Sequence, residues 1–300
     1  MALERTLPIL VLFLVGVGLK KARLLRKEDG PMLSRLILTV VLPATIIHTL
    51  SSMDISASLF LLPGAAIVVI IIFFGSSFIL ASLLGLQGKT RAAFLISFPT
   101  LEVSSIGYAF MTSMYGTEGL ARIVLFDLGD SLVFFLLVPF LAVALGQSGR
   151  TVRMSDVFLP FVKSPVLWAY AVGIFINLFH IENTFLSSLS SALSQPLLLL
   201  VMFLIAIEFE FSFSSFSLPA LAMYLKMSFG LIVGLLVSLL FGFTGIERIA
   251  VVLGSSLPAA LLTIVYAKEH GLDSQFLASM LSLALPTAIG FSFILISISH

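Results

Sequence analysis

The stretch "SFPTLEVSSIGYAF", residues 97–110, places a proline, a carboxylate, two serines and a glycine inside a long apolar run. Proline lacks a backbone N–H and clashes with the carbonyl four residues earlier, so Pro99 predicts a helix that breaks within about 95–106. Irregular backbone at bilayer depth is tolerated only against protein or a water-filled cavity. The stretch therefore predicts an interrupted transmembrane helix at a functional site.

The composition around that stretch is typical of a membrane protein. Of the 300 residues, 59% are hydrophobic and 10% are charged, whereas soluble domains have about 25% charged residues. The net charge of +1 gives no indication of a nucleic-acid partner. Cysteine is absent from the sequence, which excludes disulfides and cysteine metal sites. The first apolar run is followed by a basic cluster, so we expect a membrane span there and not a cleaved signal peptide.

Apolar runs long enough to cross the lipid bilayer recur along the whole chain. A spanning helix needs about 20 mainly apolar residues, and this criterion predicts about ten spans. They are residues 6–19, 32–51, 58–85, 92–115, 121–145, 165–180, 184–208, 217–242, 248–268 and 274–298. The sequence thus predicts an all-α polytopic membrane protein.

Lysine and arginine residues gather in alternate connections between these spans. They are Lys20, Lys21, Arg23, Arg26 and Lys27 in the first loop, Lys89 and Arg91 in the third, and Arg150, Arg153 and Lys163 in the fifth. Positively charged short loops stay in the cytoplasm. We therefore expect a multi-pass protein of the cell (plasma) membrane with both termini on the extracytoplasmic side.

The polar connection at residues 146–164 divides the predicted spans into two equal halves, 1–145 and 165–300. Because each half has an odd number of spans, the second half enters the membrane from the opposite side, as in inverted-repeat transporters. Pro99 in span four and Pro258 in span nine occupy matching positions. We predict two inverted five-helix repeats joined by a cytoplasmic linker, with helices four and nine broken and crossing at a central site.

Three acidic residues at bilayer depth, Glu102, Asp127 and Asp130, are the candidate ion-coupling residues. An ionisable side chain there costs about 2.5–3.5 kcal/mol on insertion scales and is expected to face the protein interior. Asp127 and Asp130 share one helix face, because they are three residues apart. The cluster is expected to bind sodium, at Glu102 and Asp130, to hold a proton because like charges repel, or to form a structural network with hydroxyl groups.

The candidate substrate-binding residues surround the two predicted breaks, where half-helix ends and unwound carbonyls can hold a solute. They are Thr100, Ser104, Ser105, Gly107, Pro258 and Thr263. Beyond a sodium ion, no cofactor is predicted. Glu208, Glu210 and Lys226 lie near the cytoplasmic ends of spans seven and eight, so we expect them at the membrane interface or paired with one another.

Several motifs resemble those of the auxin efflux carrier family. "LPAALLTIVYAKEHGLDSQFLASMLSLALP", residues 257–286, is similar to the family's spans nine and ten, with Ala-Lys-Glu at 267–269 and Ala-Leu-Pro at 284–286. "FLVGVGLKKARLLRKEDGPMLSRLILTVVLPATI" is similar to its first two spans, and "GYAFMTSMYG" to the end of its fourth. The resemblance covers essentially the whole chain, and it is to the bacterial or archaeal members of the family.

The resemblance implies a scaffold of spans one, two, six and seven, often forming a homodimer, and a moving domain of the other spans. It also implies elevator-type transport of organic anions. Glu102 departs from the family, which commonly has asparagine there. A glutamate on a crossing helix resembles sodium-coupled bile-acid symporters, and paired acids on span five resemble sodium/proton antiporters, both of related fold.

We therefore predict a secondary active transporter of a small organic anion, coupled to sodium or protons through the acidic cluster. The alternative is a sodium/proton antiporter without an organic substrate. Catalytic residues are not predicted, because "DLGD" at 127–130 departs from the Gly-x-Gly-Asp motif of intramembrane aspartyl proteases and no Tyr-Asp partner motif occurs. A membrane sensor or structural protein is the remaining class.

Overall fold

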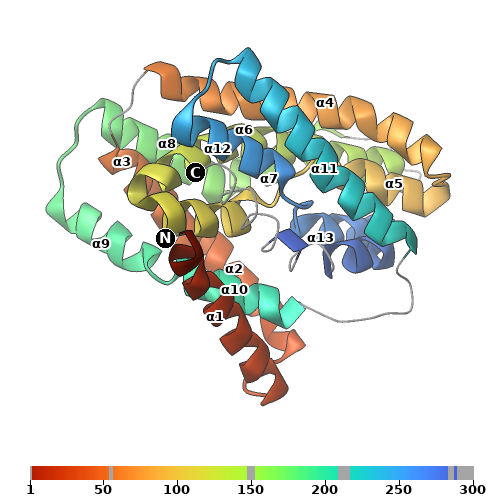
Figure 1. The fold of residues 1–300 in the computed structure, drawn as a ribbon, viewed down its shortest axis with the longest axis horizontal. Coiled ribbons are helices and arrows are strands. Elements are labelled where there is room, and N and C mark those ends of the chain that lie inside the picture. The colour runs from red at the N-terminus through yellow and green to blue at the C-terminus, as the bar shows by residue number, and fades with distance from the viewer. Residues whose placement is uncertain (1, 54–56, 147–152, 209–216, 283–286, 289–300) are drawn as a thin grey trace.

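The computed structural model describes residues 2–53, 57–146, 153–208, 217–282 and 287–288, and within these residues it contains helices and no strands (Figure 1). The α-helices are α1 (Ala2–Lys21), α2 (Gly30–Leu36), α3 (Leu42–Ser52), α4 (Leu61–Leu83), α5 (Gly88–Ser97), α6 (Tyr108–Leu145), α7 (Met154–Lys163), α8 (Pro165–Leu178), α9 (Thr184–Ser194), α10 (Leu197–Glu208), α11 (Ser217–Leu240), α12 (Gly245–Ser256) and α13 (Leu262–Glu269).

The helical segments that are long and apolar enough to cross a membrane number five in the described residues, or six if a pair bent by 52° counts as one span. They are Lys27–Ser52, Leu61–Leu83, Val103–Leu145, Thr184–Ile207 and Leu218–Leu240, and the bent pair is Val157–Lys163 with Pro165–Leu178. The protein is therefore an all-helical, multi-pass membrane protein.

Part of the shortfall from the predicted ten has identifiable reasons. Predicted spans four and nine are split into pieces too short to cross alone, such as α5 and α13. Most of the predicted span at 274–298 lies outside the described residues. The C-terminal part of span four and all of span five form one helical run, which breaks at Gly116 with φ 60° and ψ −145°. Glycine adopts positive φ without steric cost, so the chain can change direction there.

The helices pack as two groups. We call the first group the α3–α8 group. In it, α3 packs against α8 and α9, and α10 packs against α1 and α2. In the second, the α6–α12 group, α11 packs against α12, α6 against α4 and α12, and α5 and α13 also contact α6. Figure 1 shows α4, α5 and α11 together, away from α1 and α10. Helix α6 also contacts α1 and α3, so it lies at the boundary between the groups.

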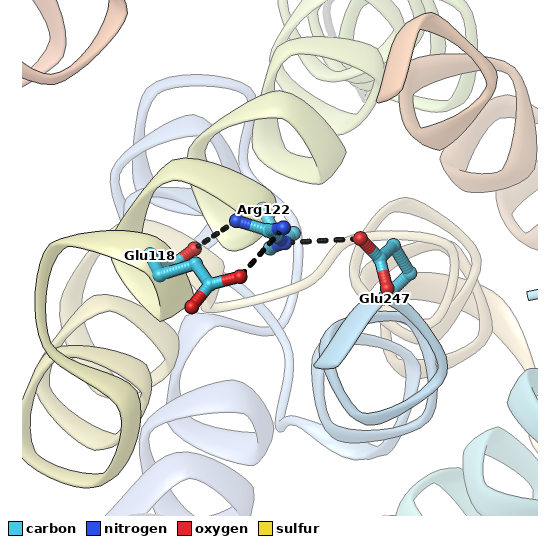
Figure 2. Close-up of polar contacts among 3 residues, drawn as sticks. All are labelled: Glu118, Arg122 and Glu247. Carbon is cyan, nitrogen blue, oxygen red and sulfur yellow. Dashed lines mark hydrogen bonds and ion pairs between the residues drawn. The ribbon is translucent and has the colours of Figure 1, made fainter. Parts of the chain in front are cut away.

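A charged contact holds α6 and α12 together within the second group (Figure 2). The Arg122 guanidinium lies 2.8 Å from a carboxylate oxygen of Glu118 on its own helix and 3.1 Å from one of Glu247 in the first turn of α12. Its Nη1 also donates to the Glu118 carbonyl at 3.1 Å. An ion pair thus joins α6, which follows the first helix interruption, to α12, which precedes the second.

Candidate transport site

The two helix interruptions lie against each other. Helix α5 ends at Ser97 and the chain becomes helical again in a π-helical segment, Val103–Gly107. Helix α12 ends at Ser256 and α13 begins at Leu262. The Glu102 N–H donates to the Pro258 carbonyl at 2.9 Å, and the Ala260 N–H donates to Thr100 Oγ1 at 3.1 Å. These bonds satisfy backbone groups that the interrupted helices leave free, as burial requires.

The Glu102 side chain caps the N-terminal end of α13. Its Oε2 accepts the Leu261 N–H at 2.7 Å, and its Oε1 accepts the Ser105 hydroxyl at 2.5 Å. A carboxylate is favourable at a helix N-terminus, where free N–H groups and the helix dipole present positive charge. Glu102 is 9% exposed. The structure therefore gives this carboxylate a capping role, in which both oxygens already have a protein donor.

Asp127 lies between two tyrosines. Its Oδ2 accepts the hydroxyl of Tyr108 at 2.7 Å and that of Tyr170 at 2.8 Å, and the two hydroxyls are 3.0 Å apart. All three residues are at most 2% exposed. Tyr108 and Asp127 belong to α6, but Tyr170 belongs to α8. The Asp127–Tyr170 bond therefore connects the two helix groups.

Asp130 has a carboxylate oxygen without a protein partner. The residue is 4% exposed, and its Oδ1 has no hydrogen bond to any described residue. An unsatisfied buried polar atom costs about 1–3 kcal/mol, more when it is charged. A bound cation or proton would remove that cost.

All three carboxylates line one cavity of about 310 Å³. The α6–α12 group contributes Ser104, Ser105, Ser131, Phe134, Phe135, Ile264, Val265 and Lys268, among others, and the α3–α8 group contributes Ser34, Ile37, Leu38, Leu42, Val166, Val201 and Leu204. Pockets for small organic ligands have volumes from about 300 Å³, mostly apolar walls and a few polar groups. The cavity between the groups fits that description.

The three carboxylates are not grouped closely enough to coordinate a metal ion together. In the part of the chain that the structure describes, no three His, Asp or Glu side chains are grouped so that they could hold a metal ion. Sodium at Asp130 would therefore also need neutral oxygens, which hard cations accept from carbonyls, hydroxyls or water. Ser131 follows Asp130 directly and lines the same cavity.

The predicted substrate-binding residues divide into two sets. Ser104 and Ser105 line the cavity, whereas Thr100, Gly107, Pro258 and Thr263 are not among the described residues that line it. Thr100 and Pro258 connect the two interruptions, and Thr263 donates to the Ala260 carbonyl at 2.6 Å. A Cβ on Gly107 would lie 3.2 Å from Leu257. A role for these four in binding a solute stays a prediction.

Lys226 is the charged residue whose position the sequence reasoning missed. Its expected location at the membrane interface is wrong, because its side chain is 0% exposed and Nζ donates to the Phe98 carbonyl at 2.6 Å. The sequence did contain an indication that Lys226 is buried. At 1.5 Å per residue, Lys226 lies about 14 Å along α11 from Ser217, far from the end of the helix. The side chains of Glu208 and Glu210 lie outside the described residues.

An all-helical membrane protein with paired helix interruptions beside a mostly apolar cavity that three carboxylates line has the features of a membrane transporter. Residues 1–150, half of the chain, match the family model described as "Membrane transport protein". The chain therefore belongs to that family, which is the auxin efflux carrier family that its motifs resemble.

Two archaeal relatives are similar to nearly the whole chain. A protein of Methanothermobacter thermautotrophicus is 26% identical over 280 residues, which cover 92% of this chain and 91% of the relative. A protein of Methanocaldococcus jannaschii is 26% identical in an alignment of 302 positions, and the match covers 92% of this chain and 92% of the relative. Both are named as uncharacterized transporters.

Proposed function

We propose that the protein is a secondary active transporter that carries a small organic anion together with sodium or a proton. The observation that carries this proposal is the buried Asp130 Oδ1, which has no partner among the described residues and belongs to a residue that lines the cavity. A cation bound there reduces the negative charge of the acidic cluster, so that an anionic solute can enter the same cavity. Lys268, at the end of α13, offers that solute a positive charge.

The size and walls of the cavity favour an organic substrate over a bare ion. A sodium/proton antiporter needs only a site for a single ion, whereas this cavity has about 310 Å³ and apolar walls that include Phe134, Phe135 and Leu204. The antiporter is the second candidate, favoured by Asp127 and Asp130 on one face of α6. It predicts cation fluxes that do not respond to any added carboxylate.

The proposed mechanism is elevator-type alternating access. The α3–α8 group acts as the scaffold, and the α6–α12 group moves across it with the solute. The packing of the helices into two groups, with the cavity walled by both, supports this assignment. In the proposed topology, residues 1–145 and 165–300 are inverted five-helix repeats joined by 146–164, so that ten helices cross the cell membrane. We also propose that both termini lie on the extracytoplasmic side and that the protein forms a homodimer.

Tyr170→Phe is expected to shift the balance between the two conformations of the transporter. In the described conformation, Tyr170 of the scaffold donates to Asp127 of the moving group at 2.8 Å, and elevator movement has to break that bond. A hydrogen bond to a charged group contributes about 1.5–3 kcal/mol, so its loss should reduce the population of this conformation roughly tenfold or more relative to the other.

The shift can be measured by cysteine labelling, because the sequence has no native cysteine. We would introduce Ser104→Cys at the cavity and compare labelling rates from the two sides of the membrane with and without Tyr170→Phe. Tyr224→Phe is the matched control, since Tyr224 lies on α11 and is 55% exposed. Equal rates for Tyr170→Phe and the control would contradict the assignment of moving and fixed groups.

Glu102→Gln is expected to lower stability as well as coupling. Glutamine keeps an acceptor oxygen for the Leu261 N–H but loses the negative charge at the start of α13, where charge–dipole interaction contributes about 0.3–1 kcal/mol. The melting temperature and the sodium dependence should both be measured. Unchanged melting together with unchanged dependence on sodium and pH would contradict both proposed roles of Glu102.

A thermal-shift screen tests the proposed function as a whole. Small organic anions would be added to the purified protein with and without sodium, at two pH values. A ligand that binds only the native state raises its melting temperature. We expect at least one anion to stabilise the protein, and to do so more strongly when sodium is present or the pH is low. Stabilisation by cations alone would favour the antiporter.

A further inference from the structure

The connection between α1 and α2, together with the last residues of α1, is the most basic stretch of the chain. It contains Lys20, Lys21, Arg23, Arg26 and Lys27 against Glu28 and Asp29. The side chains of Lys21, Arg23, Arg26 and Lys27 are exposed. Figure 1 shows α1, in dark red, running to the lower edge of the molecule, where the chain turns back towards α2. The exposed cations therefore lie at one extreme of the protein.

The backbone that carries these cations is held in place by two contacts. Lys20 Nζ donates to the Ile207 carbonyl at 2.5 Å, in the last turn of α10. The Arg26 N–H donates to Asp29 Oδ2 at 2.8 Å, across the short 3₁₀ turn Lys27–Asp29 that leads into α2. The first contact fastens the end of α1 to α10, and the second engages one of the two acidic side chains. The exposed basic side chains thus project from a fixed backbone.

Arg23 adopts a backbone conformation that glycine usually provides. Its φ is 59°, directly after the end of α1. A residue with this left-handed conformation ends many helices, and it is most often glycine because a Cβ makes the conformation unfavourable. The bonds that end α1, from the N–H of Arg23 to Lys20 and from that of Leu24 to Leu19, involve backbone atoms alone. The helix end itself therefore does not need the Arg23 side chain.

Apolar side chains stand among the exposed cations. Leu24, next to Arg23, is 72% exposed, and Met32, in α2, is 76% exposed. Segments that combine cations with apolar side chains bind at the membrane interface, where the apolar groups reach the acyl boundary and the cations meet anionic headgroups. The composition of this connection fits such an interface.

We propose that residues 20–32 form a binding surface for the phosphate headgroups of anionic membrane lipids. Five cations against two carboxylates provide the charge complementarity. In the proposed topology, this connection faces the cytoplasmic leaflet, which carries anionic lipids. Gly30, Pro31 and Ser34 belong to the same segment or follow it directly, and they line the cavity. Lipid bound here would hold one wall of the cavity at the membrane surface, whatever solute is transported.

The test measures the melting temperature of the purified full-length protein in mixed micelles. A neutral detergent is combined with phosphatidylglycerol or with phosphatidylcholine of the same acyl chains. Phosphatidylglycerol should stabilise the wild-type protein more strongly. The triple variant Lys21→Gln, Arg23→Gln and Arg26→Gln should raise the half-saturating fraction of phosphatidylglycerol tenfold or more, because each Lys or Arg at an anionic surface changes the affinity about fivefold.

A matched triple variant removes the same charge elsewhere. Lys89→Gln, Arg91→Gln and Lys163→Gln alter two other basic connections of the chain and should keep the wild-type response to phosphatidylglycerol. A role in membrane insertion alone, which the positive-inside rule already gives such residues, requires no lipid binding by the folded protein. It predicts equal responses from the wild type and both triple variants.

Arg23→Gly separates lipid binding from a structural role and serves if the triple variant does not fold. Glycine adopts a φ of 59° without steric cost, so this variant should melt at the same or a higher temperature in phosphatidylcholine. Its half-saturating fraction of phosphatidylglycerol should nevertheless rise about fivefold. A lower melting temperature in both lipids would assign Arg23 a structural role and overturn its part in the surface.

Three results would overturn the proposal and leave the transporter proposal standing. The first is equal stabilisation of the wild type by the two lipids. The second is an equal loss of the phosphatidylglycerol response in both triple variants, or in neither. The third is stabilisation by glycerol 3-phosphate in phosphatidylcholine micelles as strong as that by phosphatidylglycerol, which would assign the surface to a soluble anion instead of the membrane.

Discussion

Replacing Asp130 with asparagine is expected to abolish cation-coupled uptake and to leave the fold intact. The substitution keeps the shape of the side chain but removes the charge from the buried oxygen that has no partner among the described residues. Loss of a contact with a charged group costs about 1.5–3 kcal/mol, so cation affinity should fall about 10- to 150-fold. Because the unsatisfied buried charge is also removed, we expect the cation-free protein to melt at the same or a higher temperature.

The measurement combines melting temperatures with uptake into proteoliposomes. Asp29→Asn is the matched control, since it makes the same substitution at an exposed residue in the first loop. The control should retain both the cation-dependent melting and the uptake of the wild-type protein. Wild-type coupling in the Asp130→Asn variant would show that the coupling ion does not bind at this carboxylate.

Gly230→Ala is expected to produce the largest loss of stability. A Cβ on Gly230 would overlap the Ser255 carbonyl oxygen and would lie 2.8 Å from the carbonyl carbon and 3.0 Å from the Ser256 Cα. All three are backbone atoms in the last turn of α12, so α11 and α12 have to separate. Forced overpacking costs about 1–3 kcal/mol and occasionally more. Since α12 ends at Ser256, the displacement reaches the second interruption directly.

The test compares this variant with a glycine that has free space around it. A Cβ added to Gly75, in α4, would have no neighbouring atom within 4 Å. Gly75→Ala should therefore be neutral or slightly stabilising, because alanine favours helices by about 1 kcal/mol. We expect a much lower melting temperature and less folded protein for Gly230→Ala alone. A similar effect of both substitutions would mean that α11 and α12 are not in such close contact.

The positions of the prolines and acids were predictable from the sequence because their physical consequences are local. Proline disfavours the interior of a helix, and the helices do end near Pro99 and Pro258, although α1, α6 and α7 continue through Pro8, Pro139 and Pro160. A carboxylate far from the ends of an apolar run has to face the protein interior, and Glu102, Asp127 and Asp130 are all buried beside one cavity. Residue type and depth within the apolar run were therefore sufficient to predict these two helix interruptions and the burial of the three carboxylates.

The roles of the individual side chains depend on contacts that residue type does not specify. Glu102 has the residue type and depth of an ion ligand, but its oxygens accept bonds from Ser105 and Leu261, the latter 159 residues away in sequence. The partner of Lys226 is a backbone carbonyl 128 residues away. Tyr170 was not recognised, because a tyrosine near the start of a span is also typical of an interfacial residue. Contacts over such separations follow from the packing of the two helix groups.

The most direct measurement for the whole account is the accumulation of an organic anion, identified by the thermal-shift screen, in proteoliposomes with an imposed sodium or proton gradient. The account predicts that the wild-type protein concentrates the anion above its external concentration while the gradient lasts. The Asp130→Asn variant should at most equilibrate it. Equal accumulation with and without the gradient, or gradient-driven accumulation by Asp130→Asn, would contradict cation coupling at the acidic cluster.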